Sequence, residues 1–357
     1  MKKVLVALSV AVATASANAV TVYSNNDSQV DVGGYFDVVL GKFSKYQRTD
    51  LRNNGSRINF QAQHNLGNGL KVLGYARLRF DDFSNGVFED YQANTNTFNN
   101  PVTNKLWLAL EQDGIGRVSF GKQNTTGDAV QLNDNAYFLG GNNNLYTGGN
   151  KVVSFRSADF ELSAGQTLGF GADYVFGDAR KDTTTVNLKN AYGASLFYRG
   201  DFSGVVLNLN AGYTIESKDN NLSNNGTGRK DKSWRVASRL DFSGAKLGVE
   251  YGKTHITDST RMNVMNFLNT HYLVGAEYQV LPSSRVFTQW KRKVEVGKTA
   301  QYIYRRTDYY IIGADYDIAK NVTAYAQYAQ KRMNNGRRSG STKSKDSLYG
   351  VGLRVYF

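Results

Sequence analysis

Strict alternation of apolar and polar residues, over stretches of about ten, most limits how this chain can fold. In RINFQAQHNL (57–66) the apolar residues recur at every second position up to the alanine, and polar residues occupy the positions between them. The turn GNG (67–69) then leads into LKVLGYARLRF (70–80), which alternates in the same way. No helical period fits either stretch, so the pair predicts an antiparallel β-hairpin with one apolar and one polar face.

Short and long connections alternate along the rest of the chain. Tight turns of Gly, Asn, Asp, Ser or Pro recur, and between them stand long polar loops. In transmembrane β-barrels the turns at one rim are short and the loops at the other are long, whereas a soluble sandwich does not separate them so cleanly. The pattern predicts an all-β fold, an antiparallel up-and-down barrel of about sixteen strands. The short turns are expected at 113–116, 201–204, 241–244, 281–284 and 318–321.

The first twenty residues, MKKVLVALSVAVATASANAV, have the features of a secretory leader. Lys2 and Lys3 precede a short apolar run, and the small residues Ala17 and Ala19 form a cleavage box. We expect residues 1–19 to be a cleaved signal peptide and residues 20–357 to form one barrel domain. The apolar run is too short to span a bilayer as a helix. The alternative to a leader is therefore a buried N-terminal helix.

Composition agrees with an exported barrel. The 357 residues include no Cys and only 2 Pro, but 23 Tyr and 19 Phe. Few prolines suit long strands, and abundant aromatics suit strands and membrane interfaces. The mean hydropathy of −0.46 does not argue against a membrane barrel, since only alternate strand residues face lipid and the loops are polar.

The chain ends in another alternating strand, SLYGVGLRVYF. Pairing it with QVDVGGYFDVVLGKF (29–43) would leave no open sheet edge in lipid, where unsatisfied backbone groups are costly. A sixteen-stranded barrel is too wide for its own side chains to fill, so the fold implies a water-filled channel. The apolar face of the last strand carries Tyr349, Val351, Leu353, Val355 and Phe357.

One long connection differs from the others. Residues 124–150 mix apolar residues such as Val130, Phe138 and Leu139 with the acids Asp128 and Asp134. We expect this segment to fold into the barrel, where its apolar side chains would pack against the wall; an external loop with its own apolar cluster is the alternative.

Several of these segments resemble the general diffusion porins of Gram-negative outer membranes, most closely the major porins of Pasteurellaceae. The leader, the hairpin at 55–80, GRVSFGKQNT and the terminal VGLRVYF carry the resemblance. It implies a sixteen-stranded barrel assembled as a homotrimer, with residues 124–150 as the inserted constriction loop. YFLGG (137–141) stands where the enterobacterial branch has PEFGG, so the geometry of the constriction is left open. The resemblance also implies that the terminal aromatic strand is read by the outer-membrane assembly machinery.

The resemblance implies a pore constriction with basic residues on the wall and Asp128 and Asp134 opposite them. Alternation independently places Arg57, Arg77, Arg79 and Arg156 on the polar face but points Lys122 outward. The formal net charge of +13 would fall to about +11 with loss of the leader lysines, and we expect a weak anion preference. The wall set is Arg57, Arg77, Lys122 and Arg156 by resemblance, with Arg79 added by alternation.

The predicted function is therefore passive diffusion of small hydrophilic solutes through the outer membrane of a Gram-negative bacterium. We expect contact with lipopolysaccharide and predict no enzyme activity, metal, cofactor or nucleic-acid partner. The alternatives are a substrate-selective porin and, from a different class, a surface adhesin or hydrolase barrel. A hydrolase would need a base such as His255 with Asp258 nearby, but the three histidines lack metal-ligand spacing.

Overall fold

A computed structural model describes residues 19–80, 98, 100–178, 186–220, 228–259, 264–298, 303–337 and 340–357. These residues form nineteen strands in one sheet and one short 3-10 helix, η2 (Thr126–Val130). Three strands are short: β1 (Val20–Ser24), β3 (Asp50–Asn53) and β9 (Phe160–Ser163). The other sixteen are β2 (Ser28–Lys42), β4 (Arg57–Gly67), β5 (Leu70–Arg79), β6 (Val102–Gln112), β7 (Gly116–Asn124), β8 (Gly148–Ser157), β10 (Gln166–Phe176), β11 (Val186–Phe202), β12 (Val205–Asn220), β13 (Gly228–Phe242), β14 (Ala245–Ser259), β15 (Val264–Leu281), β16 (Ser284–Lys298), β17 (Ile303–Ala319), β18 (Val322–Arg337) and β19 (Gly340–Tyr356).

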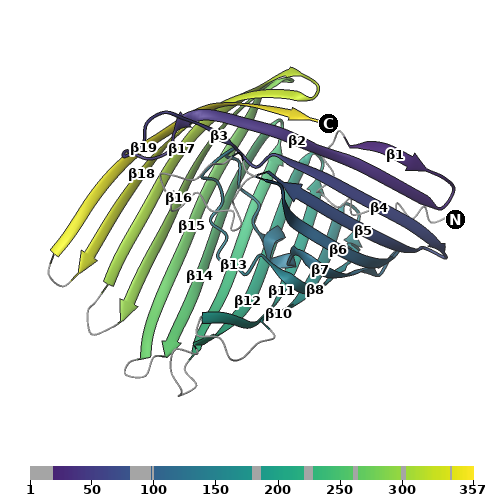
Figure 1. Cartoon of the computed structure of the whole chain (residues 1–357), viewed down its shortest axis with the longest axis horizontal. Coiled ribbons are helices and arrows are strands. Elements are labelled where there is room, and N and C mark those ends of the chain that lie inside the picture. Colours follow the sequence, from purple (N-terminus) through teal and green to yellow (C-terminus); the bar gives the residue numbers. More distant parts are fainter. Residues whose placement is uncertain are drawn as a thin grey trace.

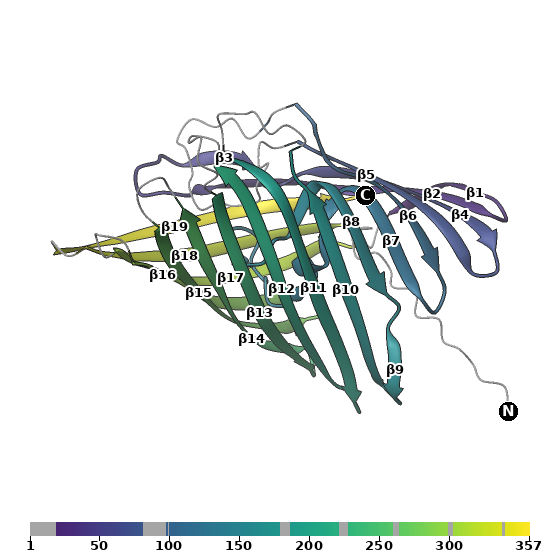
Figure 2. The same ribbon diagram turned by 90° about the horizontal axis from the view of Figure 1, so that it is seen from below.

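The sixteen long strands form a closed antiparallel barrel, as the alternation predicts. Each pairs with its neighbour in the chain, and β19 pairs with β2 from Tyr349↔Lys42 to Tyr356↔Tyr35 (Figure 1). The short strand β3 lies near the rim with the long connections, and β9 lies near the opposite rim (Figure 2). Closure removes the sheet edges that lipid could not tolerate.

Tight turns form one rim of the barrel at the places predicted from the sequence. In both DFSG turns the serine and the glycine have positive φ: 57° and 94° at Ser203 and Gly204, and 46° and 78° at Ser243 and Gly244. Two successive residues with positive φ are what a type I′ hairpin turn requires, and its twist matches that of the flanking strands. One further tight turn, around Gly165, was not predicted.

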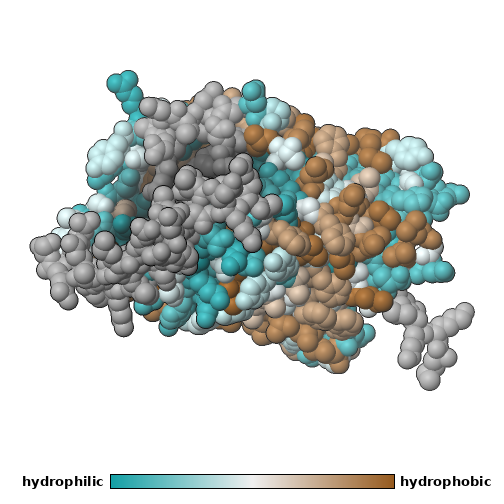
Figure 3. All heavy atoms as spheres, turned by 60° about the horizontal axis from the view of Figure 1, so that its bottom comes forward, coloured by the Kyte–Doolittle hydropathy of each residue, from teal (hydrophilic) through white to brown (hydrophobic). Residues whose placement is uncertain are grey.

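The two faces of the barrel wall differ as the alternation predicts. Large apolar side chains such as Phe60, Leu108 and Ile312 are exposed on the outside, whereas the other face holds buried polar residues including Arg235, Glu250 and Gln289. Figure 3 shows the apolar side chains gathered into a broad patch on the outer surface, with hydrophilic side chains on either side of it. Within the described residues, no helix has the length and apolar character needed to cross a bilayer.

The end of the chain is part of the barrel seam. Gly34 N donates to Phe357 O at 2.8 Å, and Phe357 N donates to Gly34 O at 3.1 Å. The Phe357 ring lies 5.2 Å from that of Phe36, and Tyr349, Val351 and Leu353 are about half exposed on the outer face. Ala19 begins the described chain, but Ala17 and the rest of the expected leader lie outside the described residues, so the cleavage site remains a prediction.

Candidate functional site

A group of basic side chains lies on the polar face of β4, β5 and β6. Arg57 is the cross-strand partner of Arg79, and Arg77 is the partner of Lys105. Direct cross-strand partners share a face, so the sheet register brings three of the predicted wall residues together and adds Lys105. Arg354 of β19 lies over the Tyr35 ring at 4.5 Å, and Arg57 lies over the same ring at 4.4 Å, which places a fifth cation near the group. We call these five residues the basic wall.

Neutral groups hold Arg77 and Arg57 of the basic wall in place. Arg77 Nε donates to Asn59 Oδ1 at 2.7 Å, and Arg77 Nη2 donates to Tyr75 Oη at 2.7 Å. The Arg57 guanidinium lies 4.4 Å from the centre of the Tyr35 ring. Amide, phenol and ring contacts fix a guanidinium without cancelling its charge, so these cations keep a positive field on this part of the wall.

Arg354 is the exception within the basic wall. Its Nη2 lies 2.6 Å from Asp37 Oδ2, and its guanidinium also contacts the rings of Tyr35 and Tyr137, at 4.5 Å and 4.8 Å. Asp37 is fully buried and also accepts a hydrogen bond from Tyr325 at 2.7 Å. This ion pair joins β19 to β2 across the barrel seam.

Residues 125–146 are bound to the same polar face of the strands. At one end, Thr126 N donates to both carboxylate oxygens of Asp173 on β10, at 3.0 and 2.9 Å, and Thr126 Oγ1 lies 3.2 Å from Ser195 Oγ on β11. Farther along, Asn210 on β12 donates to Ala129 O at 2.9 Å. The segment is therefore held by side chains of the wall and not by a strand ladder.

A buried ion pair on β13 and β14 anchors the middle of this segment. Arg235 Nε donates to Glu250 Oε2 at 2.8 Å, and both side chains are fully buried. Glu250 Oε1 accepts the backbone N–H groups of Leu132 and Asn133, at 2.8 and 2.7 Å. Arg235 Nη1 donates to Asn142 O at 3.1 Å, so one ion pair binds two separate parts of the segment. Buried charges are stable only when paired and hydrogen-bonded, as these are.

The apolar residues of the segment pack against the far side of the wall. Phe138 and Leu139 are buried in a cluster with residues of β2 and β16–β19. Tyr137 N donates to Gln327 Oε1 at 2.9 Å, and the Tyr137 ring stacks on the Tyr325 ring at 3.9 Å. These contacts explain the apolar content that sets residues 124–150 apart in the sequence. The cluster comprises Val39, Phe43, Phe138, Leu139, Phe287, Tyr309, Ile311, Tyr325, Ala329 and Leu348.

The two acids of the segment have different surroundings. Asp128 accepts a hydrogen bond from Asn124 and is attracted electrostatically by Lys105 and Arg77 of the basic wall. Asp134 instead interacts with the backbone of Gly141 and with Lys291 of β16. Both residues are solvent-exposed, yet surrounding protein displaces much of their water, and this desolvation raises the pKa of both carboxyl groups above its usual range. Asp128 is thus the acid that faces the basic wall.

Two predicted wall residues lie apart from the basic wall. Lys122 is the cross-strand partner of Leu106, a residue 59% exposed on the outer face, and its Nζ donates to Thr103 O at 2.6 Å. Its assignment to the pore was wrong, because strand parity governs its direction, as alternation indicated. Arg156 shares the polar face but pairs with Asp159 at 2.8 Å and lies over the Phe197 ring at 4.3 Å.

Sequence reasoning missed Lys105, Arg354 and the anchoring role of Arg235 and Glu250. Lys105 could have been found, because it alternates with Trp107 and Ala109 on one face of its strand. The Glu250 contacts carry no sequence signal, since their partners lie 117 and 118 residues away. Among the described residues, no group of three or more His, Cys, Asp or Glu could hold a metal ion.

The sequence profile of the Gram-negative porin family matches residues 7–336. The chain is also 34% identical over 375 residues to a major outer membrane protein of Pasteurella multocida, with all of both chains covered. The chain belongs to the Gram-negative porin family. It is therefore a multi-pass outer-membrane protein with the general function of a porin, and porins are channels.

Solved porin structures have the same fold. The trimer form of OmpT from Vibrio cholerae superposes with a TM-score of 0.67 at 18% identity, covering 93% of this chain and 100% of that chain. An anion-selective porin from Comamonas acidovorans superposes with a TM-score of 0.65 at 17% identity, also covering 93% and 100%. At these identities the likeness concerns the fold alone.

Proposed function

We propose that residues 124–150 lie across the barrel lumen and form the constriction of this porin. The supporting observation is the set of wall residues that the segment contacts. They come from β10 to β14 on one side and from β16 to β19 and β2 on the other, always on the polar face. A segment that reaches both sides of a closed barrel through the polar face passes through the interior.

The constriction would then have opposite charges on its two sides. The basic wall contributes five cations, of which Arg354 is paired with Asp37, and the segment contributes Asp128. Fixed charges in a narrow, low-dielectric passage concentrate counter-ions and determine which ions pass. Because cations outnumber acids here, the channel would have a weak preference for anions while letting small hydrophilic solutes diffuse passively.

The test is a reversal-potential measurement with purified, folded protein in a planar bilayer under a salt gradient. The proposal expects conductance with a reversal potential of anion-selective sign. A cation-selective sign would contradict the charge proposal, and an absence of conductance would contradict the channel. Saturable solute flux would favour a substrate-selective porin instead.

Three partner predictions remain with this function. OmpT of Vibrio cholerae, an outer membrane protein of similar fold, was solved in a trimer form, which supports a homotrimer. The outward set Tyr349, Val351, Leu353, Val355 and Phe357 fits an assembly signal, because it ends the strand that closes the barrel. Contact with lipopolysaccharide is expected of any protein in the outer leaflet.

A further inference from the structure

One edge of the sheet is left open beyond the barrel seam. β2 ends at Lys42, opposite Tyr349 of β19, whereas residues 340–348 of β19 continue past that point toward the long connections (Figure 1). On one side, residues 340–348 pair with β18. On the other side, no strand of the described part of the chain pairs with them. We call residues 340–348 the open edge.

The open edge lies outside the hydrocarbon of the membrane. Tyr328 and Tyr349 are cross-strand partners on the outer face, 41% and 47% exposed, and Tyr310 on β17 is 42% exposed. Tyr side chains gather at membrane interfaces, so this group marks the boundary of the hydrocarbon. Residues 340–345 lie beyond it and are exposed on both faces of the strand. The open edge therefore lies on the side of the long connections, which in an outer-membrane barrel is the cell surface.

The backbone of the open edge has a defined orientation. Phe357 exchanges two backbone hydrogen bonds with Gly34 of β2, whereas Tyr356 N donates to Asn321 O on the β18 side. Successive residues of a strand point their N–H and C=O groups to alternate sides, and neither pairing of β19 has a register shift. Odd-numbered residues of β19 therefore point these groups toward β2 and, beyond the end of β2, toward the open side. In the open edge they are Ser341, Lys343, Lys345 and Ser347.

The open edge is protected from its own copies by charge alone. Natural sheets also protect their edges with bulges and prolines, but the sequence GSTKSKDSL has no proline and its pairing with β18 is regular. Two copies of this edge paired about Ser344 would place Lys343 opposite Lys345, and like charges directly opposite each other are destabilising. The edge thus disfavours a second copy and favours a strand of opposite charge.

The outer face beside the open edge is also basic. Lys345 is the cross-strand partner of Arg332, and Lys343 is the partner of Asn334. Arg332 Nε donates to the neutral Gln330 Oε1 at 2.6 Å. Both lysines are solvent-exposed, and among the described residues neither forms an ion pair. The positive charge along this edge therefore has no nearby carboxylate to bind it.

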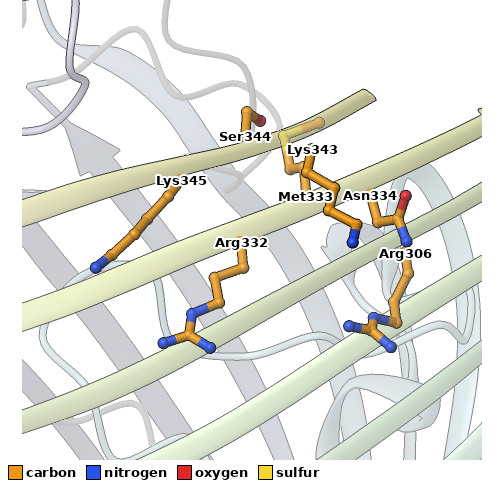
Figure 4. A pocket seen from close by; sticks show the side chains of 7 residues that line it. All are labelled: Arg306, Arg332, Met333, Asn334, Lys343, Ser344 and Lys345. Carbon is orange, nitrogen blue, oxygen red and sulfur yellow. The ribbon is translucent and has the colours of Figure 1, made fainter. Parts of the chain in front are cut away.

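The basic side chains line a hollow beside the open edge. Figure 4 shows Arg306, Arg332, Lys343 and Lys345 projecting from neighbouring strands on the same side of the sheet. The hollow has a volume of about 350 Å³. Asp308, which lies in the same part of the outer face, is already paired with Arg306 at 3.0 Å. A strand added at the open edge would place its own side chains about 5 Å from those of the two lysines, within reach of an ion pair.

We propose that the open edge binds an extended acidic segment of another protein, which adds to the sheet as a further strand on the cell surface. Backbone hydrogen bonds to the four outward-pointing residues would supply affinity, and carboxylates at alternate positions, beside Lys343 and Lys345, would supply specificity. The outward backbone groups are the reason for a strand, and charge complementarity is the reason for an acidic one.

The test measures binding of a labelled peptide to the folded protein in detergent by fluorescence anisotropy. The peptide has about nine residues, alternating threonine and glutamate, so that one face carries only acids. The native protein should bind it, and should bind the same peptide with lysine in place of glutamate at least about tenfold more weakly. The variant K343Q/K345Q should lose about tenfold in affinity for the acidic peptide, because both ion pairs are removed.

The variant S341P/S347P tests the backbone of the strand. Proline removes the N–H group of two outward-pointing residues but leaves every charge and the pairing with β18 in place, and edge strands tolerate proline where the N–H faces solvent. Affinity for the acidic peptide should fall about tenfold. The matched control S341A/S347A loses the same side-chain hydroxyls, keeps both N–H groups and should bind like the native protein. Native conductance in planar bilayers shows that each variant is folded.

The outcomes separate the acidic strand from the other possible occupants. Failure of the native protein to bind the acidic peptide would overturn the proposal. Native affinity in S341P/S347P would assign the binding to diffuse charge attraction, and equal loss from S341A/S347A would assign it to the serine side chains. A changed oligomeric state of S341P/S347P would show that a neighbouring subunit occupies the edge instead.

Discussion

Two parts of the polar face carry many cations but hold them in different ways. On β4 to β6, Arg57 and Arg77 contact amide, phenol and ring groups, and among the described residues neither forms a direct ion pair. On β13 and β14, Arg235 pairs with Glu250 in a fully buried contact, and Arg239 pairs with Asp241 at 2.9 Å. In the constriction that we propose, the partner of a cation, more than its presence on the wall, decides whether it acts on ions in the channel or stabilises the structure.

The largest effect is expected from E250A, which leaves Arg235 buried without its partner. Removing one member of a buried ion pair costs about 3–5 kcal/mol of unfolding free energy. The backbone N–H groups of Leu132 and Asn133 also lose their acceptor, so residues 124–150 should loosen and single-channel conductance should rise. Urea unfolding in detergent and planar-bilayer recordings measure the two effects.

The control for E250A is D241A, which breaks the partly exposed Arg239–Asp241 pair. We expect a loss of about 1 kcal/mol or less and native conductance. Arg239 also donates to Leu132 O at 3.1 Å, a bond that does not depend on Asp241. Similar losses from the two variants would contradict the distinction between the buried anchor and this partly exposed pair.

A smaller, purely electrical effect is expected from R77Q/K105Q in the basic wall. The anion-to-cation permeability ratio should fall by roughly twofold or more, because two of the cations that concentrate anions are gone. The free energy of unfolding should change little, since among the described residues neither Arg77 nor Lys105 forms a buried ion pair like Arg235–Glu250. K122Q removes one charge from the outer face and should leave the ratio unchanged; a fall as large as that of the double variant would contradict the strand register.

The smallest effect is a dependence of selectivity on pH. Desolvation raises the pKa of Asp128 and Asp134, so these groups bind protons at a higher pH than an ordinary aspartate. As the pH falls from about 7 to 4, their negative charge is lost, the cations remain, and the anion preference should increase. The variant D128N/D134N should start with the higher preference and show no such rise, and a native profile as flat as that of the variant would contradict the role of these acids.

Much of the fold could be predicted because its rules are local. A period of two determines which residues share a face, so Arg57, Arg77 and Arg79 could be placed on the polar face, and the turn residues identified one rim of the barrel. The anchoring of residues 124–150 could not be predicted, since Glu250 and Gln327 contact residues that lie 117 to 190 positions away in the chain. For Lys122 the two lines of evidence disagree. The family resemblance places it on the pore wall, whereas the alternation of its own strand points it outward, where the structure has it.

The most direct test of the central claim, that residues 124–150 lie inside the barrel against the wall, is a disulfide cross-link. The chain has no cysteine, and a Cβ at Gly248 on β14 would overlap the Asn133 side chain, so the two positions face each other closely once Asn133 is replaced by the smaller cysteine. In N133C/G248C folded in the outer membrane, we predict a disulfide on mild oxidation, with the same single-channel conductance before and after reduction. A pair that joins Asn133 to the outer face, N133C/F60C, should not cross-link. Failure of the first pair to form in a conducting channel would contradict the account.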